Sequence, residues 1–367
     1  MQNSQHLAAL PPRYLLLGKT LASGWTLTER IDHTNASTGS TFGVGYKATK
    51  DGQLAFVKAI DFVEAINAAD PMAELVKLSS IATFEKDVLA YCSDRGMSKI
   101  IRYIGHEYIS FDDTNDPLNR VSCLIMEAGE EDLRRMISAN GQASCSWNIQ
   151  VVRDVSQAIA QLHSGGIAHH DIKPSNVITI AAESRGSDSM KVGDLGRVIR
   201  QSQSGPFDGH HWPGDMRYSP PERWYRQAPG AIPQGWNNLR EAADAYMLGS
   251  LFVYLFTGSS MQSLVFKYIP HSFLPGQWKG GYDDDLLPVL IDAHARVLKE
   301  HLFPQLIPQV ADEIMAIARD LTHPNPNKRG DSKARKQGHQ PVGVDRIFQK
   351  FTRLALRCAA IERGMGK

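Results

Sequence analysis

The stretch IAHHDIKPSNV, residues 167–177, places two histidines, an aspartate, a lysine and an asparagine between apolar residues. It follows an amphipathic segment ending in LHSGG, and it precedes VITI, a short β-like run. A second aspartate, Asp194, arrives in MKVGDLG after another β-like run, so Asp171, Asn176 and Asp194 are expected in loops at strand edges. Carboxylate and amide oxygens suit Mg²⁺, which takes few protein ligands and leaves room for phosphate oxygens. A carboxylate that binds no metal is free to accept a proton.

The segments on either side of this stretch differ in their hydrophobic pattern. Up to about residue 130, short β-like runs alternate with polar or glycine-containing turns. These runs are WTLTERI, VGYKAT, QLAFVKAI, IIRYIGHEY and VSCLIME. After Gly129 the apolar spacing becomes helical, as in residues 146–163 with Ser146 as the expected N-cap, and in residues 241–256, which are apolar nearly all round. The pattern predicts an α+β fold with a small β-rich lobe and a larger helical lobe.

One helix is predicted inside the β-rich part, and a carboxylate lies on its apolar face. Asp70 and Pro71 are typical of an N-cap and a first helical position, and the helix is expected to end near Cys92. Glu85 lies in the middle of the apolar stripe, where a carboxylate is costly unless it is paired. It either reaches solvent at the edge of the stripe or pairs with a buried cation. Lys58, alone in the apolar run LAFVKAI, is the expected partner.

Composition limits the class of protein. The chain has 367 residues, 42% hydrophobic and 22% charged, which is ordinary for a soluble globular protein of one large or two modest domains. The longest apolar stretch, residues 245–256, is shorter than the ~20 residues that span a bilayer. No signal peptide is predicted at the N-terminus, and the four cysteines form no CxxC pair. We therefore expect a cytoplasmic protein with reduced thiols and without a membrane span.

The net charge of +1 hides a basic end of the chain. From Lys328 onward eleven Lys and Arg residues stand against three acidic residues, a local charge of +8. Such a tail could contact nucleic acid, acidic lipid or the acidic body of the protein. Apolar residues recur at helical spacing between Val344 and Ile361, mostly apart from the basic ones. This pattern favours a helix packed on the domain, with a solvated basic face, over a nucleic-acid partner.

These segments, taken together and in this order, resemble the Hanks-type (eukaryotic-type) Ser/Thr protein kinases. The resemblance covers roughly residues 22–330 and implies a bilobal kinase fold. It implies that HHDIKPSN is the catalytic loop, with Asp171 as the base, Lys173 as a stabiliser of the transferred phosphoryl group and Asn176 as a Mg²⁺ ligand. DLG would supply Asp194 as the other Mg²⁺ ligand, and Lys58, paired with Glu85, would hold the phosphates of ATP.

Further segments acquire roles from the same resemblance. LIMEAGEEDL, residues 124–133, looks like the hinge that binds adenine. The implied nucleotide contacts are Met126 as gatekeeper, backbone groups of Glu127 and Gly129, Asp132 at the ribose, and Gly39 and Gly43 in the glycine-rich loop. GDMRYSPPE would end the activation segment, with Glu222 paired to Arg329 and Asp244 anchoring the catalytic loop. The implied division is an N-terminal extension (1–21), a kinase domain (22–330, with lobes of about 22–127 and 130–330) and a basic helical tail (331–367).

Three departures from the family pattern affect the expected activity. The glycines near residue 43 lack GxGxxG spacing and Gly45 replaces a usual valine, which predicts loose ATP binding. His170 replaces the arginine that receives an activation-loop phosphate, so we expect a non-RD kinase that needs no such phosphorylation. Asp215 replaces a usual threonine; its carboxylate could pair with Lys173 but would lie unfavourably close to the carboxylate of Asp171. The pair His210-His211 has a metal-site interpretation, but loop surface is the preferred one.

The resemblance predicts Mg-ATP-dependent phosphoryl transfer to Ser or Thr hydroxyls of a protein substrate, with autophosphorylation allowed. One alternative is a pseudokinase scaffold, although Lys58, Asp171 and Asp194 are all present. Another is a kinase of small-molecule hydroxyls, against which the lysine two residues after Asp171 argues. Tyrosine specificity is less favoured for the same reason. The substrate, the activating signal and the oligomeric state do not follow from the sequence.

Overall fold

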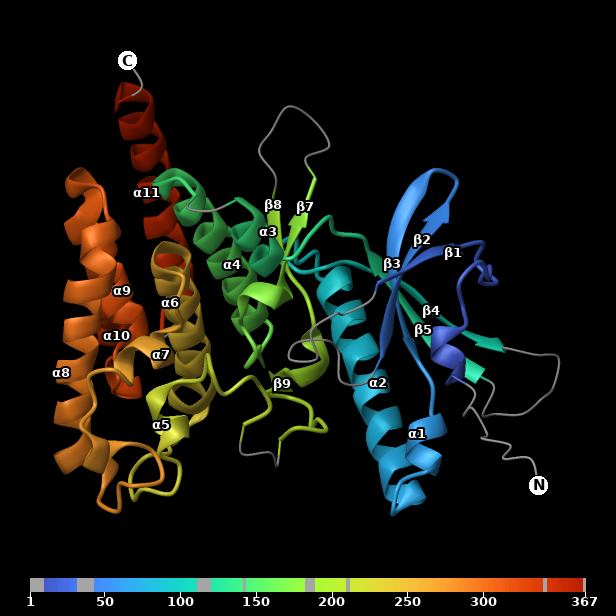
Figure 1. Cartoon of the computed structure of the whole chain (residues 1–367), viewed down its shortest axis with the longest axis horizontal. Coiled ribbons are helices and arrows are strands. Elements are labelled where there is room, and N and C mark those ends of the chain that lie inside the picture. Colours follow the sequence, from blue (N-terminus) through green and yellow to red (C-terminus); the bar gives the residue numbers. More distant parts are fainter. Residues whose placement is uncertain are drawn as a thin grey trace, which may run out of the picture. The chain divides into compact units, whose positions relative to one another are not determined.

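The computed structural model describes residues 10–31, 43–110, 120–140, 143–181, 189–208, 212–338 and 342–365. The chain divides into two compact units (Figure 1). The N-terminal unit comprises Met1–Gly96 and Ile101–Gly129, and the C-terminal unit comprises Met97–Ile100 and Glu130–Lys367. The domain boundaries expected at residues 21 and 330 remain predictions.

The N-terminal unit is built on a five-stranded antiparallel sheet with strand order β1-β2-β3-β5-β4. The strands are β1 (Thr26–Ile31), β2 (Val44–Lys50), β3 (Gln53–Ile60), β4 (Tyr103–Ser110) and β5 (Arg120–Glu127). The expected strands are therefore confirmed, with ends shifted by a few residues. Asp51 and Gly52 both have positive φ, which makes a tight β2–β3 hairpin of the kind that Asp-Gly favours. Leu16 and Leu21, before the strands, are buried in the same core as the sheet residues.

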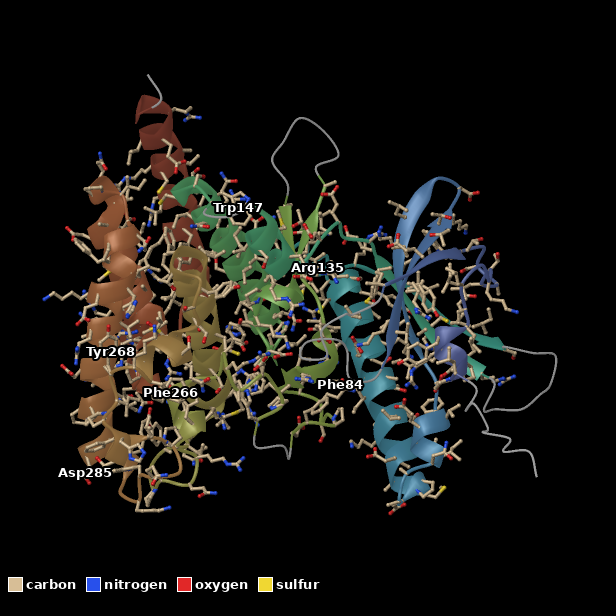
Figure 2. All side chains as sticks on the ribbon, viewed as in Figure 1. Phe84, Arg135, Trp147, Phe266, Tyr268 and Asp285 are labelled. Carbon is tan, nitrogen blue, oxygen red and sulfur yellow. The ribbon has the colours of Figure 1, made fainter. Side chains whose placement is uncertain are left out.

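Three helical segments accompany the sheet: η1 (Pro12–Tyr14), α1 (Val63–Ile66) and α2 (Pro71–Asp94). The predicted start of α2 is confirmed, because the side chain of Asp70 accepts the N–H of Ala73 at 3.1 Å. The buried face of α2 contains the predicted Glu85 and also Phe84, which is labelled in Figure 2.

The C-terminal unit is mainly helical. Its helices are α3 (Leu133–Asn140), α4 (Cys145–Ser164), α5 (Pro221–Trp224), α6 (Ala242–Thr257), α7 (Met261–Val265), α8 (Leu287–Val297), α9 (Ala311–Thr322), α10 (Ser332–Gln337) and α11 (Val344–Met365). Its strands are β6 (Ile167–Ala168), β7 (Val177–Ile180), β8 (Ser189–Val192) and β9 (Ile199–Arg200), paired as β6-β9 and β7-β8. Short 3₁₀ and π segments are η3 (Pro174–Asn176), η4 (Leu195–Arg197), η5 (Asn237–Glu241), η6 (His271–Phe273), η7 (Tyr282–Leu286), η8 (Leu298–Leu302), η9 (Phe303–Gln305), η10 (Pro308–Val310) and η11 (Pro326–Lys328).

The centre of the C-terminal unit is α6, which is buried on nearly all sides, as its sequence predicts. It packs against α4 and α9 (Figure 1). Gly249 permits the close approach of α9, since a Cβ atom there would lie 2.5 Å from Cγ2 of Thr322. The elements around the catalytic loop are therefore supported by a rigid helical core.

The cap of α4 differs from the sequence prediction. Ser144 caps the helix, with its hydroxyl accepting the N–H of Trp147 at 3.2 Å, so the assignment of Ser146 was wrong. Both Ser146 and Ser144 precede the apolar run, and only the tertiary packing separates their roles. The N–H of Ser146 donates to Glu362 of α11 at 3.1 Å, and its hydroxyl donates to the same carboxylate.

The C-terminal helix α11 lies along α4, and its apolar stripe is the buried side. Phe351 of this stripe meets Phe252 of α6 edge to face. Two of its basic residues form ion pairs, Lys350 with Asp331 at 2.8 Å and Arg357 with Glu313. In the described part of the chain, no helix is both long enough and apolar enough to cross a bilayer.

Candidate active site

The N-terminal unit contains the ion pair expected from the sequence. Nζ of Lys58, on β3, donates to both carboxylate oxygens of Glu85, on α2, at 2.9 and 2.7 Å. The side chains of Lys58 and Glu85 are 11% and 3% exposed. The pairing is therefore confirmed, and the alternative that Glu85 reaches solvent is wrong. A lysine held by both oxygens of a buried carboxylate points in one direction.

The start of β2 explains one irregularity of the glycine-rich segment. Gly45 pairs with Lys58 in the sheet, and a Cβ atom on Gly45 would lie 2.9 Å from the ring of Phe56. A valine there would collide with that ring, so an aromatic residue on β3 fills the space that a larger side chain on β2 would take. At Gly43, a Cβ atom would lie 3.1 Å from the carbonyl oxygen of Ala59. Gly39 falls outside the described residues.

The residues expected at the hinge lie at the end of β5. Met126 is buried and pairs in register with Phe56 on one side and Tyr103 on the other. The N–H of Glu127 donates to the carbonyl of Arg102 at 2.9 Å, and its carboxylate accepts the N–H of Arg102 at 3.1 Å. Gly129 is the last residue of the N-terminal unit. Their contacts with adenine stay predictions.

Asp132, in the C-terminal unit, stands at the start of α3. Its carboxylate accepts the N–H of Arg135 at 3.0 Å, a contact that stabilises the first turn of this helix. Arg135 is labelled in Figure 2. The expected ribose contact of Asp132 stays a prediction.

The carboxylate of Asp244, on α6, holds the backbone of the catalytic loop. It accepts the backbone N–H groups of His169 and His170, both at 2.8 Å, and Nε2 of His163 lies 2.9 Å away. Burial raises the pKa of Asp244, but the bond to His163 and the nearby histidines outweigh it, so the pKa lies below its usual value. The anchoring role expected for Asp244 is thus confirmed in geometry. His163 was not recognised from the sequence.

His169 connects the two loops that carry the candidate catalytic carboxylates. Its Nδ1 accepts the N–H of Asp171 at 3.2 Å, so Nε2 carries the proton and donates to the carbonyl of Gly193 at 3.2 Å. Gly193 directly precedes Asp194. One imidazole therefore fixes the spacing between the backbones of both loops.

The carboxylate of Asp171 is buried at 1% exposure and lies among several donors. Oδ2 lies 2.9 Å from Nζ of Lys173 and 3.6 Å from the guanidinium of Arg197. Oδ1 accepts the N–H of Asp215 at 2.8 Å. These contacts orient the carboxylate. Arg197 was missed from the sequence; its only signal is its position directly after DLG.

Asn176 and Asp194 were expected to bind Mg²⁺. The amide nitrogen of Asn176 donates to the carbonyl of Asp171 at 2.8 Å, which leaves its oxygen as the end able to bind a cation. The carbonyl of Asn176 accepts the N–H of Gly193 at 2.9 Å, and Asp194 follows with φ of 55°. An amide and a carboxylate oxygen fit Mg²⁺, which uses one or two protein ligands together with phosphate oxygens. Among the described residues, no cluster of three or more His, Cys, Asp or Glu side chains could hold a metal ion.

A second buried ion pair lies after the activation segment. Both terminal nitrogens of Arg329 donate to the carboxylate of Glu222, at 2.8 and 2.7 Å, and both side chains are almost fully buried. The pair expected from the sequence is therefore confirmed.

A family model described as the protein kinase domain matches residues 39–273. The chain is 29% identical over 199 residues to the mitogen-activated protein kinase mpkB of Aspergillus fumigatus, covering 52% of each chain. It is 27% identical over 173 residues to the serine/threonine-protein kinase PknB of Mycobacterium tuberculosis, covering 45% of this chain and 25% of that protein. The chain belongs to the Hanks-type Ser/Thr protein kinase family. It spans only half of mpkB and a quarter of PknB in these alignments.

Two departures of this kinase from its family pattern can be placed in the structure. The carboxylate of Asp215 accepts three hydrogen bonds from the guanidinium of Arg217, and it accepts the backbone N–H of the same residue. Burial raises the pKa of Asp215, yet the bonds to Arg217 bring it below the usual value. The side chain of Asp215 therefore bonds to Arg217 instead of forming the possible pair with Lys173, whose charge nevertheless also lowers the pKa of Asp215. The uneasy approach to Asp171 is also avoided, since the backbone of Asp215 faces that carboxylate.

The other departure is His170, which is fully buried with φ of 62°. Burial lowers the pKa of His170 to about 3, so the ring is neutral at physiological pH. The pair His210-His211, in the same activation segment, lies outside the described residues.

Proposed function

We propose that this kinase transfers the γ-phosphoryl group of ATP to Ser or Thr hydroxyls of a protein substrate. The observation that carries the proposal is the carboxylate of Asp171. It accepts the N–H of Asp215 at 2.8 Å on one oxygen and lies 2.9 Å from Lys173 on the other. A carboxylate oriented in this way can accept a proton from an incoming hydroxyl, while the neighbouring ammonium can contact a phosphoryl oxygen.

The other residues act by position and charge. Lys58, held by Glu85, would contact phosphate oxygens of the nucleotide. Asn176 and Asp194 would hold Mg²⁺, which neutralises charge that develops on the phosphates. Lys173 carries its positive charge beside Asp171, so that a negatively charged phosphoryl group is attracted to the hydroxyl being activated.

Replacement of the base tests the proposal. Asp171→Asn should lower the rate of phosphate transfer by about 10²- to 10⁴-fold, the usual cost of losing a general base. Transfer is measured with labelled ATP and Mg²⁺, with phosphorylated residues mapped on the protein itself and in a cell extract. Asp292→Asn, at an exposed position on α8, is the matched control and should keep the wild-type rate.

The result also separates the alternatives. An Asp171→Asn variant that keeps most of the activity would contradict the assignment of the base. Folded wild-type protein that transfers no phosphate would favour a pseudokinase scaffold, and label found only on small molecules would favour a small-molecule kinase.

We also propose that activity does not require phosphorylation of the activation segment. The neutral ring of His170 cannot form the charged, two-pronged contact with phosphate that an arginine forms. Ser219 is buried, and its hydroxyl donates to the carbonyl of Met216 at 2.8 Å, so it is a poor acceptor. Ser202 and Ser204 are exposed, and Tyr218 is partly buried.

Replacement of the three accessible hydroxyls tests this independence. Ser202→Ala, Ser204→Ala and Tyr218→Phe together should leave the rate of transfer within several-fold of wild type. A large loss of rate that acidic residues at the same positions restore would show that phosphorylation is needed.

A further inference from the structure

His170 occupies an unusual position in the catalytic loop. Its backbone N–H is held by Asp244, but neither ring nitrogen has a hydrogen-bond partner in the part of the chain that the structure describes. A buried polar ring without a hydrogen-bond partner is destabilising, so another contact must offset that cost. That contact is the indole of Trp212, which stacks on the imidazole with ring centroids 5.1 Å apart and planes inclined by 20°.

Trp212 is fixed from a second element as well. The guanidinium carbon of Arg223, on α5, lies 5.2 Å from the centroid of its indole. Arg223 is itself buried and donates to the carbonyl of Leu239 at 3.0 Å. A cation at this distance from an aromatic ring is attracted to it, and more strongly in a desolvated place. The indole thus connects the activation segment to the catalytic loop and to α5.

The backbone that follows Trp212 lies directly on the catalytic loop. At Gly214, a Cβ atom would come within 1.9 Å of the carbonyl oxygen of His170, so any larger residue would push the two backbone segments apart. The same position is 3.2 Å from Nε1 of Trp212. One residue later, the N–H of Asp215 reaches Oδ1 of Asp171 at 2.8 Å.

We propose that Trp212 is a positioning residue for phosphate transfer. By stacking on His170, its indole holds Gly214 and Asp215 against the catalytic loop, so that the N–H of Asp215 orients the carboxylate of Asp171. The aromatic stack thereby holds the activation segment against the catalytic loop, as a contact between a phosphate and an arginine would otherwise do. The catalytic part of this inference rests on the proposed function, whereas the contact between the two segments does not.

Three variants test the proposal, with activity and amide hydrogen exchange as separate measurements. Trp212→Ala removes the stack, and Trp212→Phe keeps an aromatic ring. Trp278→Ala is the matched control, since it removes an indole from another stacked pair, with Phe273 at 4.7 Å, in segment 271–281.

We expect Trp212→Ala to lower kcat by roughly 10- to 100-fold, the scale of a misplacement of about 1 Å, with little change in KM for ATP. Amide exchange in residues 212–219 should become faster. Trp212→Phe should restore most of kcat and of the protection, and Trp278→Ala should leave both at wild-type values.

Two results would overturn the positioning role: an unchanged exchange rate in residues 212–219 of Trp212→Ala, or a loss of kcat no larger than that of Trp278→Ala. If wild-type protein transfers no phosphate, the proposed function fails, and the exchange measurement alone decides whether Trp212 holds this segment. A global loss of folding in Trp212→Ala is recognised by its melting temperature, and Trp212→Phe then supplies the comparison.

Discussion

Each unit of this protein contains one buried ion pair that was expected from the sequence, and the two pairs differ in their surroundings. Lys58 keeps 11% of its side chain exposed and donates to both oxygens of Glu85. Arg329 is completely buried, and besides Glu222 it donates to the backbone carbonyls of Ala242, His323 and Pro324.

The difference indicates what each pair does. Arg329 connects three backbone carbonyls, from two segments of the chain, with one carboxylate. Its side chain is buried from solvent, so its charge serves the fold. Lys58 is held in direction by Glu85 but keeps an accessible part, so its charge can act on a ligand. A buried pair is weak evidence of stability in general, because desolvation offsets much of the attraction. The two pairs can be told apart by experiment.

The largest effect is expected at Arg329. Arg329→Met leaves Glu222 and three carbonyls without their donor, so the free energy of unfolding should fall by about 3–5 kcal/mol. Urea denaturation followed by circular dichroism measures it. The control is Arg296→Met, which removes a pair with Glu300 that is about half exposed on both sides and should change stability by less than about 1 kcal/mol. A similarly small effect at Arg329 would show that its ion pair does not stabilise the fold.

The next effect concerns Lys58. Lys58→Met should reduce phosphate transfer by about 10²- to 10³-fold, the cost of losing one well-placed electrostatic contact. The double variant Lys58→Met with Glu85→Leu should remain inactive but fold well, because apolar residues can replace a buried pair at little cost. Lys47→Met, at an exposed pair with Glu29, is the control and should keep full activity. An active double variant would show that Lys58 has a structural role alone.

The smallest effect is a dependence of stability on pH in the C-terminal unit. Burial lowers the pKa of both His170 and His294 to about 3, from an ordinary 6.5. Below pH 6.5 the unfolded chain binds protons at these sites and the folded chain does not. The free energy of unfolding should therefore fall by up to about 1.4 kcal/mol for each histidine as the pH decreases by one unit, from 6.5 to 5.5.

His294→Gln isolates one of these contributions. The imidazole of His294 bonds with the hydroxyl of Thr322 at 2.8 Å and faces His323, Arg319 and Arg329. Urea denaturation of this variant at pH 7, 6 and 5 should show a smaller slope than wild type. Equal slopes would mean that folding does not lower the pKa of His294.

Much of the fold could be predicted from the sequence because the patterns that indicate it involve neighbouring residues. Strand periodicity and the cap at Asp70 depend on neighbouring residues, and both were predicted from them. The cap of α4 was assigned to the wrong serine, since Ser144 and Ser146 are equally suitable until Glu362 of α11 takes one of them. The partner of Asp215 could not be predicted for a related reason, because pairing depends on side-chain directions that the sequence does not contain.

The sequence alone was enough to indicate the family, the order of the elements and the buried pair Lys58–Glu85, because a charged residue in an apolar run requires a partner of opposite charge. The buried pair Glu222–Arg329 was expected only from the resemblance to the kinase family. Only the tertiary structure decided how the catalytic loop is held. His163 contacts Asp244, which holds this loop, and Arg197 and Trp212 contact the loop directly. They come from three different elements or loops, and apart from the position of Arg197 directly after DLG they carry no local signal. These contacts depend on how distant segments pack together, and the resulting distances cannot be inferred from the spacing of residues along the chain.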